Sequence, residues 1–143
     1  MSALLDVNVL VSLFDPAHIH HDAAHAWFGA HRGEGWATCP LTENGFARVL
    51  SNPAYPGRRT TVADAVDRLA GLAESGDHTF WADRISLLDD SIVERGRLSG
   101  HRQITDAYLL ALAVSNDGRV VTFDRGFPLG AVLAAETDHV VVL

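Results

Sequence analysis

Four acidic residues, Asp6, Glu43, Asp106 and Asp124, stand where predicted elements begin or end, in stretches that otherwise look apolar or helix-starting. A carboxylate in a core-like run is unfavourable unless it is paired or binds a cation. Carboxylates gathered without a cation repel one another, and several would hold protons at neutral pH. Because hard oxygen ligands suit Mg²⁺ and Mn²⁺, the four residues predict a site for such an ion. A cation held in this way can activate water and offset charge on a phosphodiester, so the predicted chemistry is phosphodiester hydrolysis.

Each acid also has a simpler interpretation. Glu43 and Asp106 could be first-turn acids that interact favourably with a helix dipole. Asp124, within Thr122-Phe123-Asp124-Arg125-Gly126, could be an ordinary turn residue, and Asp6 could cap the helix that follows it. The joint placement of the four acids, more than any one of them, favours a metal site.

Apolar runs and helical periodicity predict an alternation of short strands with helices. The expected strands are 3–7, 36–38, 79–81, 120–123 and 139–143, and the expected helices are 9–14, 20–31, 61–73, 90–97, one capped by Thr42 and one capped by Thr105. This alternation predicts a single α/β domain over residues 1–143, with three layers and a mainly parallel central sheet flanked by helices.

That architecture would also gather the acids. Ligands of open parallel sheets bind outside the carboxyl ends of the strands, where the following helices begin. Asp6 and Asp124 close predicted strands, and Glu43 and Asp106 lie in the first turns of predicted helices. We therefore expect all four carboxylates to converge on one edge of the sheet.

Composition narrows the class of protein. Hydrophobic residues make up 48% and charged residues 20% of the 143, and no apolar run approaches the roughly 20 residues that span a bilayer. The opening residues lack the basic start of a secretory signal, so we expect a cytoplasmic protein without a membrane segment. The single Cys39 cannot form an internal disulfide.

The charge pattern bears on nucleic-acid binding. A formal net charge of −7 argues against attraction of nucleic acid to the whole surface, but it allows a local site. All eleven basic side chains are Arg and none is Lys, which suits phosphate contacts but could equally reflect codon bias.

The acids and their neighbours, in this order, resemble the PIN-domain ribonucleases, in particular the VapC-type toxins of bacterial toxin–antitoxin pairs. The resemblance covers nearly the whole chain and is carried by Leu5-Asp6-Val7-Asn8-Val9-Leu10, by Glu43 with Arg48-Val49-Leu50-Ser51-Asn52-Pro53, by Ile104-Thr105-Asp106-Ala107-Tyr108-Leu109, and by Thr122-Phe123-Asp124-Arg125-Gly126-Phe127. It implies that Asp6, Glu43, Asp106 and Asp124 form the acidic metal site, with Asn8 and Thr122 as supporting polar neighbours. It further implies a Mg²⁺- or Mn²⁺-dependent endoribonuclease that cleaves tRNA or ribosomal RNA, an antitoxin partner and a homodimer.

Other polar residues have two interpretations each. Arg125, beside Asp124, is the best candidate for a phosphate contact but could be a surface turn residue. Arg48, Arg58 and Arg59 could line an RNA path, which only the fold can decide. The crowded histidines suggest either a transition-metal site or, as we favour, a solvated helix face; they are His18, His20, His21 and His25.

Two other function classes remain open. One is a receiver-like domain in which Asp6 accepts a phosphoryl group, although such a domain would normally place a Lys beside the acceptor and this chain has none. The other is a non-catalytic α/β module that binds a protein partner and uses its acids only as helix caps. Phosphate-loop nucleotide hydrolysis and serine-nucleophile hydrolysis are disfavoured because both motifs are missing.

Overall fold

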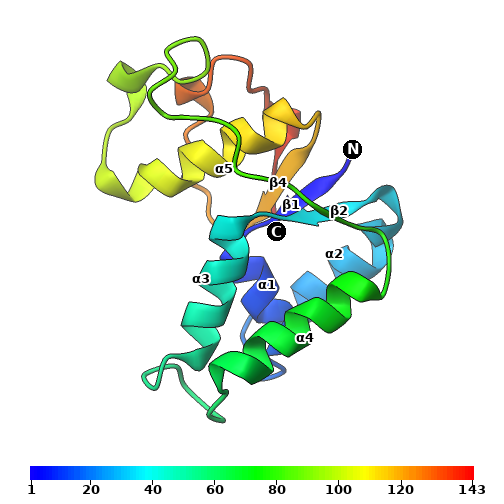
Figure 1. Cartoon of the computed structure of the whole chain (residues 1–143). Coiled ribbons are helices and arrows are strands. Elements are labelled where there is room, and N and C mark those ends of the chain that lie inside the picture. Colours follow the sequence, from blue (N-terminus) through cyan, green and yellow to red (C-terminus); the bar gives the residue numbers. More distant parts are fainter.

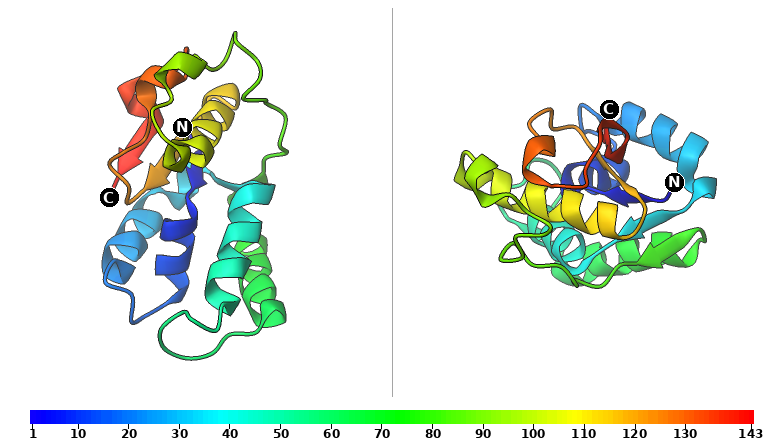
Figure 2. Two further views of the ribbon diagram at one scale, coloured as in Figure 1. Left: turned by 90° about the vertical axis from the view of Figure 1, so that its left-hand side faces the viewer. Right: turned by 90° about the horizontal axis from the view of Figure 1, so that it is seen from above.

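The computed structural model describes residues 1–143 and contains a parallel five-stranded sheet between two layers of helices (Figures 1 and 2). The strands are β1 (Ala3–Leu5), β2 (Trp36–Thr38), β3 (His78–Phe80), β4 (Arg119–Thr122) and β5 (Val140–Val142). The helices are α1 (Val7–Phe14), α2 (His21–His31), α3 (Pro40–Ser51), α4 (Val62–Glu74) and α5 (Ile104–Ser115). Five short 3₁₀ helices complete the secondary structure: Arg32–Glu34, Arg95–Arg97, His101–Gln103, Leu129–Ala131 and Thr137–His139. The predicted three-layer α/β fold is confirmed.

The strand order, β3-β2-β1-β4-β5, places the first strand in the centre of the sheet. The chain proceeds from β1 outward to β2 and β3 on one side, and then returns to the other side as β4 and β5. The order therefore reverses between β1 and β4, which are paired in register with Leu5 opposite Val121. In open α/β sheets this reversal leaves a crevice at the carboxyl ends of the two strands.

Alternation along the strands explains the two layers of helices. Ala3 and Leu5 pack into a core with α1 to α4, whereas Leu4 between them points to the opposite face and packs with α5. Both faces of the sheet are thus covered, which is why the central strand β1 is apolar throughout. In Figure 1, α1 to α4 lie below the strands and α5 lies above them.

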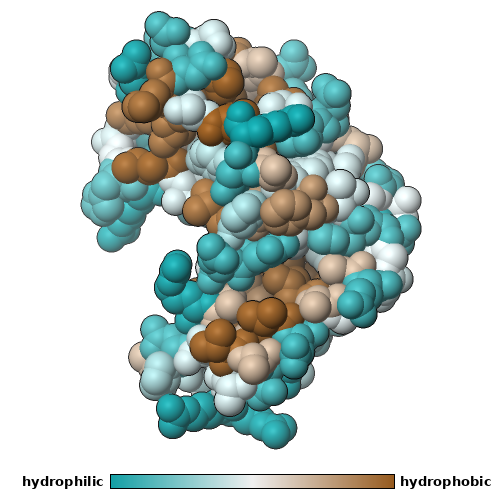
Figure 3. All heavy atoms as spheres, viewed as in Figure 1, coloured by the Kyte–Doolittle hydropathy of each residue, from teal (hydrophilic) through white to brown (hydrophobic).

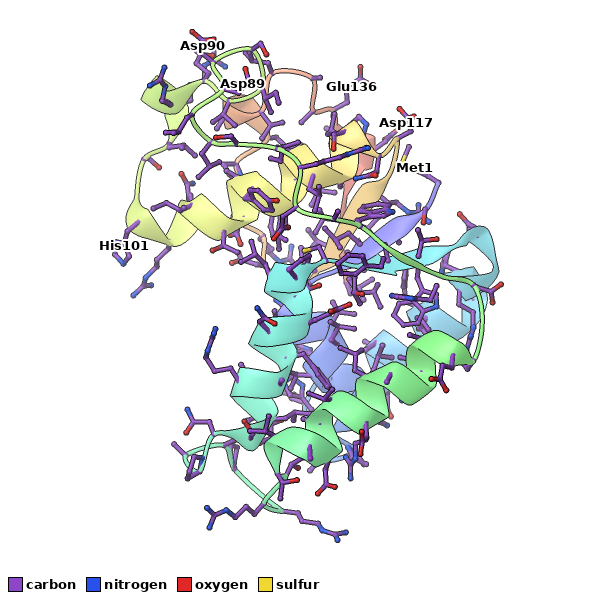
Figure 4. The ribbon with its side chains drawn as sticks, in the orientation of Figure 1. Met1, Asp89, Asp90, His101, Asp117 and Glu136 are labelled. Carbon is purple, nitrogen blue, oxygen red and sulfur yellow. The ribbon has the colours of Figure 1, made fainter.

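The amino ends of the strands lie at the edge opposite the crevice. Figure 4 labels Met1 and Asp117, which precede β1 and β4, side by side at that edge, and the Arg119 N–H donates to the Ser2 carbonyl there at 2.9 Å. Gly118 lies in the same turn, where a side chain would collide with Trp81 and with the Ser2 carbonyl. This edge is filled by structural contacts and leaves the carboxyl edge for ligands.

Three local predictions were wrong. Residues 90–97 do not form a helix; Val93 makes a lone antiparallel bridge with Val132, and only Arg95–Arg97 forms a 3₁₀ turn. The third helix begins at Pro40 because proline suits a first helical turn, and the Thr42 hydroxyl accepts the Cys39 N–H at 3.0 Å from inside that turn. The fifth helix begins at Ile104, so Thr105 lies within it and does not cap it.

Candidate functional site

Asp6 lies at the crevice between β1 and β4 and is the N-cap of α1. One of its carboxylate oxygens accepts the Val7 N–H at 2.7 Å, and the other accepts the hydroxyl of Thr122, the last residue of β4, also at 2.7 Å. Burial raises the pKa of the Asp6 carboxyl, and the two hydrogen bonds oppose that rise. The capping role and a place in the site are therefore compatible.

Thr122 is completely buried and connects Asp6 to the two other polar residues of the crevice. Its Oγ1 accepts the side-chain amide of Asn8 at 3.3 Å and the backbone N–H of Asp124 at 3.0 Å. The Asn8 carbonyl oxygen in turn accepts the Phe123 N–H at 3.3 Å. These bonds connect Asp6 and Asp124 across adjacent strands, and a supporting role of Asn8 and Thr122 in the site stays a prediction.

Asp106 reaches the same crevice from the first turn of α5. Its carboxylate makes no hydrogen bond within the chain, unlike that of Asp6. Partial burial raises the pKa of Asp106 to about 6, and the negative charges of Asp6 and Asp124 add to the rise. Three carboxylates thus repel one another across one space, which is the electrostatic condition that a bound cation relieves.

These three aspartates line a common cavity of about 400 Å³, together with Asn8 and Val49. The cavity opens between the start of α5 and α3, on the side of the molecule that is visibly hollowed in the space-filling view (Figure 3). Asp124 is exposed and Asp6 and Asp106 are half-buried, so a ligand can enter from solvent.

Glu43 does not join them, contrary to our expectation of four converging acids. Its carboxylate accepts the hydroxyl of Thr38, the last residue of β2, at 2.7 Å. Glu43 also lines a separate, mostly apolar cavity of about 250 Å³ between α3 and α4. Glu43 lies away from the aspartates because α3 packs against α1 through the face that carries Gly45. Gly45 packs so closely against Val7 that a Cβ there would lie 2.6 Å from the valine side chain, and residue 43 is rotated from residue 45 by about 200° around the helix axis.

Two residues that the sequence analysis did not assign to the site also line the aspartate cavity, His18 and Tyr55. The Nδ1 of His18 accepts the His20 N–H at 3.0 Å and lies 3.2 Å from the Ser12 hydroxyl. A backbone N–H can only donate, so in the neutral ring the proton is on Nε2, which has no partner within the chain. A signal was present in the sequence, because His18 lies two residues after the Asp15-Pro16 stop at the end of α1.

The other histidines of this segment have structural contacts. The side chain of His21 lies 2.8 Å from the Ser12 carbonyl, and that of His25 lies 2.8 Å from the Leu13 carbonyl, so both tie α2 to α1. His20 is exposed and stacks on Phe123 with ring centres 4.2 Å apart. Arg125 is exposed in the turn after β4 and has no ion pair, so its predicted phosphate contact stays a prediction.

The donor set suits a hard cation that keeps part of its water shell. No group of three or more His, Cys, Asp or Glu side chains is gathered closely enough to hold a metal ion together. Mg²⁺ is usually bound by one or two protein carboxylates, with water and substrate phosphate as the remaining ligands. The unpartnered Asp106 and the mutual repulsion of the aspartates fit this open type of site.

The helices are also too short to span a bilayer; the longest, α4, has 13 residues.

Sequence comparisons point to one family. Residues 3–132 match the PIN domain family. The chain is 48% identical to Ribonuclease VapC44 of Mycobacterium tuberculosis over the full length of both proteins. It is 47% identical to Ribonuclease VapC39 of the same organism over 87% of this chain and 89% of that protein.

The fold has a solved counterpart. The crystal structure of Mycobacterium tuberculosis VapC20, described as a sarcin-ricin loop cleaving toxin, aligns with a TM-score of 0.61 over 92% of this chain and 96% of that chain. At 13% sequence identity this likeness concerns the fold alone. With the family match over residues 3–132 and the relatives at nearly half identity, the chain belongs to the PIN-domain family and, within it, to the VapC ribonucleases.

Proposed function

We propose that this protein is an endoribonuclease toxin that hydrolyses RNA phosphodiester bonds with Mg²⁺ or Mn²⁺ and thereby inhibits translation, with tRNA or ribosomal RNA as substrate. The observation that carries the proposal is the single cavity at the β1–β4 crossover that Asp6, Asp106 and Asp124 line together. Membership of the VapC ribonucleases supports RNA as the substrate.

One or two of the three aspartates would bind the cation directly and the remaining carboxylate charge would help to attract it, with Asp6 and Asp124 kept in register by Thr122. When bound, the ion would supply an activated water and would offset charge on the phosphate that is attacked. His18 would donate from Nε2 to a phosphate oxygen that enters the cavity, because its Nδ1 is engaged and its Nε2 is free. Glu43, a predicted fourth ligand, is proposed here to act as a structural residue because it lines a separate cavity, where it accepts the Thr38 hydroxyl.

The partners follow from the same family. We propose that a cognate antitoxin protein neutralises the toxin, that the toxin forms a homodimer, and that it acts in the cytoplasm where its RNA substrates are.

The experiment is cleavage of total cellular RNA by the purified protein with Mg²⁺, with Mn²⁺ and with EDTA, with the new 5′ ends mapped by sequencing. We expect discrete cleavage sites in tRNA or ribosomal RNA that disappear with EDTA and in Asp6→Asn. Cleavage that persists in EDTA would contradict the metal, and the absence of any RNA cleavage would contradict the proposed activity.

The control separates catalysis from folding and excludes the two alternatives. Asp6→Asn keeps the oxygen that accepts the Val7 N–H, so the helix cap should persist and the circular dichroism spectrum should not change. A receiver-like domain would instead be labelled by a small phosphodonor at Asp6, and a binding module would leave RNA intact.

A further inference from the structure

A second cavity, polar and rich in arginine, adjoins the aspartate cavity. It has a volume of about 300 Å³ and lies between the loop after α3 and the middle of α4, with Arg58, Thr60 and Arg68 among the residues that line it. Tyr55 lines both cavities and so forms the wall between them. A chain-like ligand that leaves the aspartates past Tyr55 therefore has two ways to these arginines, directly or through the cavity that His18 and Asp15 also line.

The two arginines have no partner within the protein. The ion pairs of the chain use Arg32, Arg97 and Arg119, and Arg84 is bonded to the Ser115 carbonyl, whereas Arg58 and Arg68 make neither hydrogen bonds nor ion pairs. They come from different elements, an irregular loop and a helix, and line the same space. Since nothing in the chain uses their guanidinium groups, these are available to an external anion.

The charge of this cavity fits one phosphodiester. Its only acid is Asp15, whose two oxygens accept the Tyr55 hydroxyl and the Ala17 N–H. The Tyr55 hydrogen bond, the largest influence, lowers the pKa of Asp15, which therefore stays ionised. Two arginines and one aspartate leave a net charge of +1, in a protein whose total is −7.

Tyr55 is held in a fixed orientation between the two cavities. Its hydroxyl donates to Asp15, and desolvation together with this bond raises the pKa of Tyr55 to about 12, so it stays protonated. A half-buried ring that cannot swing away presents a constant surface to a passing base, and stacking on such rings is a common, sequence-tolerant contact with single-stranded RNA.

We propose that the cavity lined by Arg58, Thr60 and Arg68 binds a backbone phosphate of the single-stranded RNA whose neighbouring phosphodiester lies in the aspartate cavity, with Tyr55 between the two. This inference rests on the proposed ribonuclease function and extends it to the path of the substrate. It also distinguishes among the arginines of the loop, because Arg59 lines neither cavity.

The test measures binding without cleavage. Asp106→Asn serves as the parent protein, and its affinity for a fluorescein-labelled single-stranded oligoribonucleotide of mixed sequence is measured by anisotropy with Mg²⁺ over a series of salt concentrations. Arg58→Ala and Arg68→Ala are introduced separately, and Arg59→Ala is the matched control because it removes the same charge from the same loop. All three arginines are exposed, so the variants should fold as the parent does.

We expect Arg58→Ala and Arg68→Ala each to weaken binding roughly tenfold at low salt and to lower the slope of log K against log salt by about 0.7, the value of one lost phosphate contact on a single strand. Arg59→Ala should change the affinity less than about twofold. Equal losses in all three variants would show general attraction without a subsite, and unchanged binding in Arg58→Ala and Arg68→Ala would also overturn the inference.

The outcome is separable from that of the proposed function. If the wild-type protein cleaves RNA but the two arginine variants bind and cleave normally, only the subsite is wrong. If the wild-type protein does not cleave RNA and the parent does not bind it, both proposals fail; if the wild type cleaves RNA but the parent does not bind it, only the subsite is wrong. In active protein, Arg58→Ala should raise KM and leave kcat nearly unchanged, because the lost contact is remote from the phosphate that reacts.

Discussion

Two buried threonines occupy the same position at the ends of different strands, and their surroundings differ in an instructive way. Thr122 ends β4 and donates to Asp6, whereas Thr38 ends β2 and donates to Glu43, both at 2.7 Å. Around Thr122 the further groups are carboxylates and the Asn8 amide. Around Thr38 the further group is His78, whose Nε2 lies 2.8 Å from the threonine hydroxyl.

The difference lies in how many carboxylates share each cavity. Thr38 connects Glu43 and His78 by two hydrogen bonds beside a mostly apolar cavity between α3 and α4. Hydrophobic residues gather where these two helices meet in Figure 3. Burial lowers the pKa of His78, which therefore donates as a neutral ring. Asp6 accepts a hydrogen bond on each oxygen and Asp124 accepts the Gly126 N–H, whereas Asp106 accepts none. Glu43 is the one acid of its cavity, whereas three carboxylates raise one another's negative potential at the crossover of the strands and are available there to a cation.

The largest expected effect separates the two groups of acids by activity. Asp106→Asn should lower kcat/KM for RNA cleavage by roughly 10²-fold or more, since a metal centre contributes several kcal/mol of charge stabilisation. Glu43→Gln keeps the hydrogen bond from Thr38 and should retain activity within about tenfold. The measurement is the initial rate of RNA cleavage by both variants under identical conditions. Equal losses of activity would show that Glu43 and Asp106 do not have the different roles assigned to them.

A smaller effect is expected from the two threonines. Thr122→Val and Thr38→Val should each destabilise the fold by about 1–3 kcal/mol, because each leaves a carboxylate and a second buried polar group short of a partner. Only Thr122→Val should also reduce cleavage, by roughly 10- to 100-fold, through misplacement of Asp6 and Asp124. Urea unfolding and RNA cleavage rates of both variants test this prediction. Loss of activity in a folded Thr38→Val protein would contradict the claim that only Thr122 supports the cation site.

His18 should contribute one hydrogen bond to the substrate. His18→Ala is expected to lower kcat/KM about tenfold, the equivalent of about 1.5 kcal/mol for a bond to a charged oxygen. His25→Ala is the control, since that ring contacts a backbone carbonyl away from the cavity. If His25→Ala lost stability and His18→Ala kept full activity, His18 would be only part of the cavity wall.

The smallest effect concerns pH and the protein without metal. The pKa of Asp106 is about 6 in the folded protein, above its ordinary value of 3.8, so the folded state binds more protons between these limits. Stability from this group is therefore present at low pH and is lost as pH rises through about 6. With EDTA at pH 7, Asp106→Asn should be more stable than the wild type by about 1 kcal/mol after allowance for solvent screening, and the difference should vanish near pH 4. Urea midpoints at both pH values check the sign.

Much of this arrangement could be predicted from the sequence because it depends on local patterns. Strands 36–38 and 120–123, and the helix over 61–73, were evident from apolar runs and periodicity. Asp6 and Asp124 follow directly from strands, so their meeting required only that β1 and β4 be neighbours, which is a common order in parallel sheets.

The rest depends on contacts that no single segment contains. The face of α3 that meets α1 is set by the close approach of Gly45 to Val7, and this decides that Glu43 points toward His78. Residues 90–97 have helical periodicity but are held extended at Val93 by pairing with Val132, about forty positions away. The place of His18 and Tyr55 beside the aspartates likewise depends on how the two loops pack against each other.

Titration of the protein with Mn²⁺ in the absence of RNA, measured by isothermal titration calorimetry, tests most directly whether the aspartates bind a cation. We expect the wild type and Glu43→Gln to bind Mn²⁺ with similar affinity and Asp106→Asn to bind it at least tenfold more weakly, with all three proteins folded. Binding that is unaffected by Asp106→Asn, or that is lost in Glu43→Gln, would contradict a cation site made by the three aspartates.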